Sequence, residues 1–165
     1  MIAQVLKQLE TALKDDSVGY AVHVAAVASA NSVTLPDVPD NHIYGTDTPV
    51  DAKKVNLPAL VLTPTETSTE EIRSQGRRDS VHTVTFEYAT EDPDEEEWRD
   101  EAMYMAEALM RFLDNFNSCN SSYVGTSGAI LVQGWRADYT VTWKAPPNAI
   151  RGFIVEAEIY SRDTF

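Results

Sequence analysis

Side chains able to do chemistry are few in this chain and lie far apart. Its three histidines, His23, His42 and His82, share no metal-ligand spacing such as His-x-x-x-His. The single cysteine, Cys119, has serine and asparagine neighbours and no histidine close to it in sequence, which favours an inert thiol over a catalytic one. We find no glycine-rich phosphate loop, Walker motif or nucleophile elbow. We therefore expect no catalytic residue, no metal site and no cofactor.

One acidic run needs a separate explanation. Residues 91–97 carry six carboxylates, which could bind a divalent cation through oxygen ligands, but their spacing is not that of an EF-hand loop. The start of a helix explains them better, because negative side chains are favourable at a helix N-terminus. Asp92 is suited to the N-cap and Pro93 to the first helical position. We expect helix capping at this run rather than a metal site.

The stretch from Ser80 to Phe116 organises the predicted fold. Residues 80–89 alternate as in a half-buried strand, with His82, Val84, Phe86 and Tyr88 on one face. A long amphipathic helix follows to Phe116. Its apolar stripe comprises Trp98, Ala102, Met105, Ala106, Leu109, Phe112, Leu113 and Phe116. This spacing predicts a helix that lies on a sheet.

Five further elements flank this pair. We predict an amphipathic helix over Ile2–Lys14 and a strand over Tyr20–Ala28, although the alanines of the latter would equally suit a buried helix. Leu57–Thr63 predicts a strand that is apolar on both faces and ends at Pro64. Ala129–Lys144 and Ile150–Ser161 predict an antiparallel hairpin. The order α-β-β-β-α-β-β indicates one α+β domain over residues 1–165, with an antiparallel or mixed sheet and two helices packed on it.

The strand over Ala129–Lys144 is unusually aromatic. Trp135, Ala137, Tyr139, Val141 and Trp143 alternate with polar residues. Uninterrupted alternation places all five on one face, and we expect that face to be part of the core rather than a surface that stacks a ligand.

Two long segments are predicted to be irregular. Residues 31–56 and 64–79 are rich in turn-forming and hydroxyl residues, and both exceed an ordinary connection in length. The second ends with Arg73, Arg77 and Arg78. It can be interpreted as a solvated loop, or as a protruding arm that pairs its arginines with an acidic surface on another copy of the protein.

The charge balance narrows the class of partner. The net charge of −13 argues against a nucleic-acid-binding surface and against docking on anionic membranes. The apolar run over residues 19–30 is too short to span a bilayer. Partners are expected to be proteins, although the charge could equally serve solubility.

Three residues of the long helix lie outside its apolar stripe. Met103 and Met110 are two turns apart on one flank, and Tyr104 lies on the other side. Exposed methionine and tyrosine are enriched at protein interfaces, but the methionines could equally widen the core stripe.

The order and texture of these elements resemble the tail-terminator and tail-completion proteins of tailed bacteriophages. The resemblance rests on the N-terminal helix, the LPALVLTP segment, the RRDSVHTVTFEYA strand with its MAEALMRFLDNF helix, and the closing hairpin that ends GFIVEAEIYSRDTF. It covers most of the chain except residues 31–56. Such proteins assemble as hexameric rings on the end of the tail tube and join it to the connector of the capsid.

This resemblance implies a structural virion protein of the neck or tail, assembled in the host cytoplasm, and not an enzyme. Its partners would be further copies of itself, the tail tube protein and connector proteins. DNA would pass through an acidic lumen without specific binding. We take Arg73, Arg77, Arg78, Met103, Tyr104 and Met110 as candidate subunit contacts.

Other neck components, such as a head-closure or adaptor protein, are the nearest alternative. A small enzyme or ligand-binding protein, with Glu87, His82 and Cys119 as candidates, is the rival from a different class.

Overall fold

We describe the fold from a computed structural model of the chain. It describes residues 2–45, 55–73, 77–91, 97–119, 130–145 and 149–164, and within these it gives only the backbone of residues 69–73, 77–78, 97, 117–119, 130–131 and 163–164. The elements, in chain order, are α1 (Ile2–Leu13), α2 (Tyr20–Asn31), the short 3₁₀ helix η1 (Asp40–His42), β1 (Ile43–Tyr44), β2 (Ala59–Arg73), β3 (Arg77–Glu91), α3 (Glu97–Cys119), β4 (Ile130–Lys144) and β5 (Ile150–Thr164).

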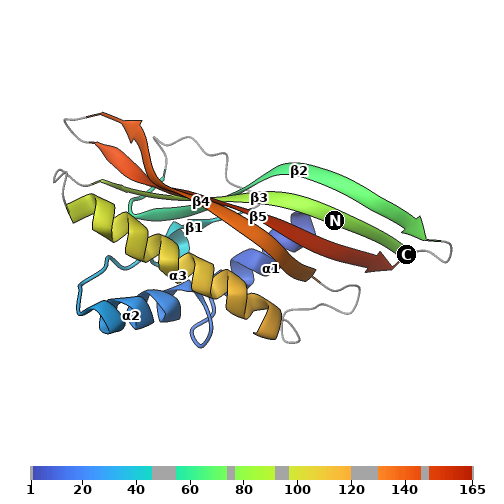
Figure 1. The fold of residues 1–165 in the computed structure, drawn as a ribbon, viewed down its shortest axis with the longest axis horizontal. Coiled ribbons are helices and arrows are strands. Elements are labelled where there is room, and N and C mark those ends of the chain that lie inside the picture. Colours follow the sequence, from blue (N-terminus) through green and yellow to red (C-terminus); the bar gives the residue numbers. More distant parts are fainter. Residues whose placement is uncertain are drawn as a thin grey trace.

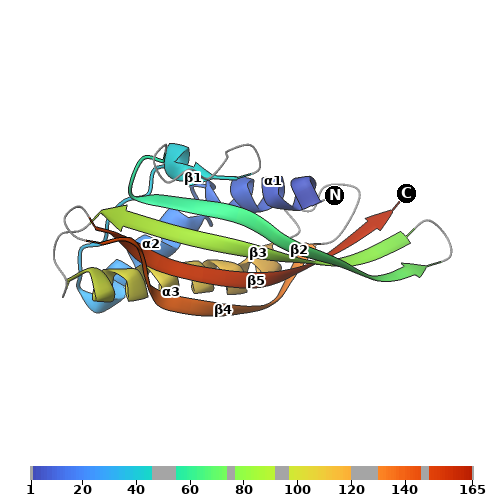
Figure 2. The same cartoon turned by 90° about the horizontal axis from the view of Figure 1, so that it is seen from above.

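The strands form one mixed sheet in the order β1-β2-β3-β5-β4. The short β1 pairs in parallel with β2, and all other neighbours are antiparallel. Strands β2, β3 and β5 extend past the helices at one end of the molecule (Figures 1 and 2). The chain is a single α+β domain, as its pattern of elements predicts.

All three helices cover the same face of the sheet (Figure 1). In Figure 2 the strands pass in front of α2 and α3, so that view looks onto the face without helices. The predicted stripe of α3 is buried in full, and so are the predicted inward residues of β3 and β5, among them Phe86, Tyr88, Phe153 and Val155. The hydroxyl of Tyr88 donates a hydrogen bond of 2.9 Å to Glu101, which fixes α3 against β3.

The prediction of a strand over Tyr20–Ala28 is wrong, since this segment forms helix α2. Its buried side chains, Tyr20, Val24 and Val27, recur at helical spacing. The buried hydroxyl of Tyr20 donates a hydrogen bond of 2.9 Å to the carbonyl of Met105, which ties α2 to α3. The sheet is therefore covered by three helices rather than two.

The boundaries of several other elements also differ from the prediction. Of residues 64–79, expected to be irregular, 64–73 continue β2 and 77–79 begin β3. A shift of register between Pro64 and Glu66 accommodates the proline within the ladder. Part of the first irregular segment forms η1 and β1. Helix α3 continues past Phe116 to Cys119. The predicted cap at Asp92 and Pro93 lies outside the described residues.

The uninterrupted alternation predicted for β4 is also wrong. Asp138 pairs with Ile154 and Val141 pairs with Gly152. Between these two pairs β4 advances by three residues and β5 by two, so β4 contains one extra residue. One extra residue reverses the face to which the following side chains point. Trp135 and Tyr139 therefore lie on the helix-bearing side and Trp143 on the opposite side, and the three are 39%, 38% and 37% exposed instead of forming core.

A tight approach between β5 and β3 yields a stability prediction. A Cβ atom at position 152 would collide with the carbonyl oxygen of Tyr88 and lie 3.2 Å from the Trp143 ring. We expect Gly152→Ala to lower the free energy of unfolding by about 2–4 kcal/mol, measured by urea denaturation. Gly134→Ala is the matched control, because a Cβ at 134 meets nothing within 4 Å, and it should change stability by less than about 0.5 kcal/mol. Equal effects would contradict the close approach.

Candidate subunit interface

An exposed apolar surface runs along the seam between α3 and β4. Met103, Met110 and Asp114 follow one another at helical spacing on a flank of α3. Trp135 donates its indole N–H to Asp114 Oδ1 at 3.2 Å, and the hydroxyl of Tyr139 lies 3.8 Å from Met110 Sδ. These five residues form what we call the α3–β4 surface.

The position of β4 in the sheet explains why these side chains are exposed. Among the described strands β4 pairs with β5 alone, so it is an edge strand. Helix α3 buries its stripe toward the centre of the sheet and leaves its flank, with Met103 49% exposed, beside β4. The aromatic side chains of β4 therefore lean on the rim of α3 without being covered by it.

The α3–β4 surface carries residue types that are enriched at protein interfaces. Tryptophan, tyrosine and methionine are enriched at interfaces, and the first two often carry much of the binding energy. Three shifts of register interrupt β4, and Arg136, Asp138 and Lys144 are exposed along it. Such irregular, charged edges oppose pairing with another strand. A partner would therefore bind through the side chains of this surface rather than by extending the sheet.

The predicted contact residues of α3 are not equivalent in the structure. Met103 is exposed and Met110 is half-buried beside Tyr139, so both belong to the α3–β4 surface. Tyr104 is partly buried and packs against the core, on another side of the helix. Trp135 and Tyr139 were missing from the prediction because the sequence pattern assigned them to the core.

The three predicted arginines lie at the end of the β2–β3 hairpin. Arg73 and Arg77 are Cα partners where β2 and β3 meet, and Arg78 follows in β3. This end of the hairpin projects beyond the helices (Figure 1). The backbone thus brings the three together at one tip, although their side chains lie outside the described atoms.

Two residues of the enzyme alternative, His82 and Glu87, are separated by the sheet. His82 and Glu87 are an odd number of positions apart on β3, so their side chains lie on opposite faces of the sheet. Cys119 ends α3, and its side chain is not described.

His82 belongs instead to a polar chain that sequence reasoning missed. Its Nε2 lies 2.8 Å from Ser161 Oγ and its Nδ1 lies 3.0 Å from Thr67 Oγ1. This is the spacing of a nucleophile and its base, but His82 is fully buried and Ser161 nearly so. A hydrogen-bonded tie between β2, β3 and β5 accounts for the arrangement, since a buried imidazole needs partners. The register between β3 and β5, which the sequence does not show, creates the pair.

The remaining histidines are separate from one another. Nδ1 of His42 lies 3.0 Å from the carbonyl oxygen of Pro58, and His23 packs edge-on against Phe112, where burial lowers its pKa. No group of three or more potential metal ligands occurs in the described part of the chain. Within the same ranges, no helix is long and apolar enough to cross a membrane.

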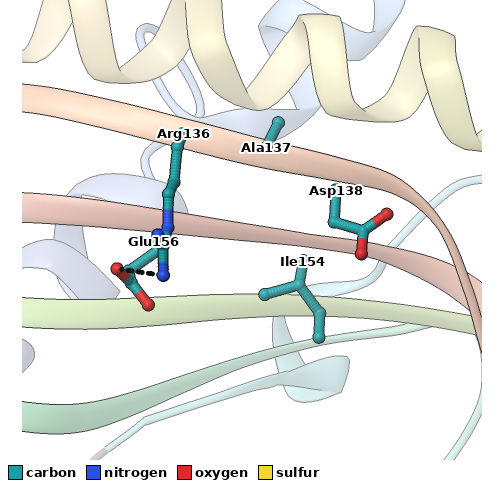
Figure 3. A pocket seen from close by; sticks show the side chains of 5 residues that line it. All are labelled: Arg136, Ala137, Asp138, Ile154 and Glu156. Carbon is teal, nitrogen blue, oxygen red and sulfur yellow. Dashed lines mark ion pairs between the residues drawn. The ribbon is translucent and has the colours of Figure 1, made fainter.

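The face of the sheet without helices carries two neighbouring hollows. One, of about 250 Å³, is lined by Leu57, Val61, Glu87, Trp143 and Ile150 with two further apolar residues, and burial among them raises the pKa of Glu87. The other, of about 270 Å³, is lined by Arg136, Ala137, Asp138, Ile154 and Glu156, and is drawn in Figure 3. In it Arg136 and Glu156 form an ion pair of 3.0 Å.

The raised pKa of Glu87 gives a pH dependence with a definite sign. The folded state holds a proton on Glu87 more tightly than the unfolded state does, so stability is lost as pH rises through the raised pKa. We expect Glu87→Gln to be more stable than the parent at pH 7, with a difference that vanishes below pH of about 4, where both side chains are neutral. Urea denaturation of dilute protein measures this. Glu158→Gln, at an exposed carboxylate of the same face, should show little change at either pH.

Comparison with known proteins assigns the chain to no family. No protein-family model matches the chain, and no curated protein has a significantly similar sequence.

Proposed function

We propose that this protein is a ring-forming structural subunit of a tailed-phage virion, a tail terminator that caps the tail tube at the head–tail junction and joins it to the connector. The proposal combines the resemblance in element order with a surface suited to self-association. Assembly would take place in the host cytoplasm, and the protein would then reside in the neck or tail of the virion.

The observation that carries the self-association is the α3–β4 surface. Met103, Trp135 and Tyr139 each leave 38–49% of their surface exposed, side by side on one rim of the domain. Folding alone gives no reason to expose them, whereas burial against a partner would recover about 25 cal/mol for each square ångström of apolar surface. An interface between copies is the simplest use of such a rim.

The net charge constrains how such a ring would hold DNA. With 26 acidic and 13 basic residues, the chain offers little to neutralise phosphates, so a lumen lined by its average surface would repel DNA. The genome could then pass without adhering. Another neck component, a head-closure or adaptor protein, would satisfy the same observations, and a small enzyme or ligand-binding protein remains the alternative from a different class.

The oligomeric state is the first test of this proposal. We expect size-exclusion chromatography with light scattering to give a closed oligomer, with a hexamer as the expected size, and electron microscopy to show rings. Mixing with purified tail tubes should cap their ends. A chain that stays strictly monomeric at high concentration would refute the ring and favour the enzyme or ligand-binding alternative.

Substitutions on the α3–β4 surface test where the ring contact lies. We expect Met103→Glu combined with Tyr139→Glu to weaken association by about tenfold or more, because two carboxylates would have to be buried in an apolar contact. Sedimentation velocity over a concentration series measures the effect. Val22→Glu is the control, since Val22 is similarly exposed on α2 at 37%, away from this surface, and should leave association unchanged. Unaltered association of the double variant would remove the α3–β4 surface from the interface.

A further inference from the structure

We propose that the arginine-bearing tip of the β2–β3 hairpin docks onto the helix-free face of the sheet in a second copy of this chain, in the groove that contains Glu87. This inference rests on the proposed ring and deepens it, because it names the surface that receives the tip. The occupant is the tip of another copy, which carries Arg73, Arg77 and Arg78.

The receiving groove is built by one row of side chains across the sheet. Val61 pairs with Glu87, Glu87 pairs with Ile154, and Ile154 pairs with Asp138. The two hollows described above lie on either side of this row and share the same helix-free face. The row therefore offers apolar walls with carboxylates at Glu87 and Asp138.

The groove has an excess of negative charge. Glu156, two residues along β5 from Ile154, stands on the same face and lines the same hollow as Asp138. Arg136 is the basic residue that lines these hollows, and its guanidinium already pairs with Glu156. Two of the three lining carboxylates, Glu87 and Asp138, are thus left without an arginine from this part of the described chain.

Glu87 is the member whose environment most needs a cation. It is half-buried among apolar side chains, and its carboxylate makes no hydrogen bond or ion pair with the described part of the chain. Its raised pKa follows from this burial. An arginine suits such a site, because its aliphatic stem can cover apolar walls such as Trp143 while its guanidinium binds the carboxylate.

The tip supplies the complementary chemistry. It gathers three of the 13 basic residues within six positions of a chain whose net charge is −13. The backbone places them where the hairpin turns, clear of the helices that cover the other face (Figure 2). At the base of the tip the buried Asp79, next to Arg78, forms an ion pair of 2.9 Å with Arg162.

The tip cannot reach the groove of its own molecule. Arg77 and Glu87 are ten residues apart on one continuous strand, which corresponds to about 33 Å at the rise of a β-strand. Both positions are fixed in the same sheet, so a contact between tip and groove has to join two copies.

Such a contact has the symmetry that a ring requires. The tip and the groove are different surfaces, so each copy uses one to bind its neighbour and the other to be bound. Contacts of this heterologous kind close into rings when the rotation between copies permits. A twofold dimer, in contrast, would use the same patch on both copies.

A complementation experiment tests the proposal. The tip variant carries Arg77→Glu and Arg78→Glu, and the groove variant carries Glu87→Lys and Asp138→Lys. Each alone should associate at least tenfold more weakly than the parent in sedimentation velocity, because like charges would meet at every interface. An equimolar mixture should assemble, since alternating copies pair either two parental surfaces or two reversed ones. Assembly of the mixture should weaken as sodium chloride is raised.

Two controls separate the contact from net charge and from folding. Lys7→Glu with Arg99→Glu, and Asp16→Lys with Asp100→Lys, change the net charge by the same amounts at exposed positions on or next to the helices. Both should assemble like the parent. Circular dichroism and thermal unfolding should show that the tip and groove variants remain folded.

The possible results are distinguishable. If the parent assembles and the tip variant alone fails to, with no rescue in the mixture, the tip docks elsewhere, for example on a different protein, and this inference is overturned while the ring stands. Unimpaired assembly of either variant also overturns it. A monomeric parent overturns both the ring and the docking.

Discussion

The structure depends on one constraint, the burial of a single face of a long antiparallel sheet. The inward residues of β3 and β5 and the stripe of α3 form one core, and α1 and α2 complete it from the same side. Because strand side chains alternate, every residue that is not inward is left on a face that no described helix covers. The apolar material of the chain is thus concentrated on one side, and the other side is free to carry charged and half-buried groups such as Glu87.

Burial on one face also determines what happens at the rim. Helix α3 lies over the side of the sheet formed by β5 and β4 and turns its stripe toward the core, so the edge strand β4 meets its flank. The extra residue between Asp138 and Val141 then divides the aromatic side chains of β4 between the two faces. Trp135 and Tyr139 join Met110 and Asp114 on one side, while Trp143 becomes a wall of the Glu87 groove on the other. One local irregularity therefore contributes to both surfaces to which we assign contacts.

Much of this fold follows from sequence period, and the exceptions have physical causes. The helix that includes Leu109 and the strands around Phe86 and Val155 are long and strongly patterned, so their types and buried faces are predictable. The strand predicted over Tyr20–Ala28 is wrong because a short, alanine-rich apolar run has no clear period. The predicted strand end at Pro64 is wrong because the register shift beside this residue lets the ladder continue although proline has no backbone N–H to donate. The exposed aromatic residues of β4 could not be recognised, since both the bulge and the edge position depend on pairing that distant segments decide.

Charge explains why two kinds of surface would be needed in one assembly. Copies that each carry a charge of −13 repel one another, and apolar burial at the α3–β4 surface has to overcome that repulsion without selecting an orientation. A local basic tip that meets a local acidic groove supplies attraction at one relative orientation and repulsion at others, because electrostatic complementarity acts mainly on specificity. The apolar rim would then provide the affinity and the hairpin would determine the direction in which copies follow one another. Removal of the apolar rim should leave pairs that still form but separate quickly, whereas removal of the tip should leave contacts without a fixed geometry.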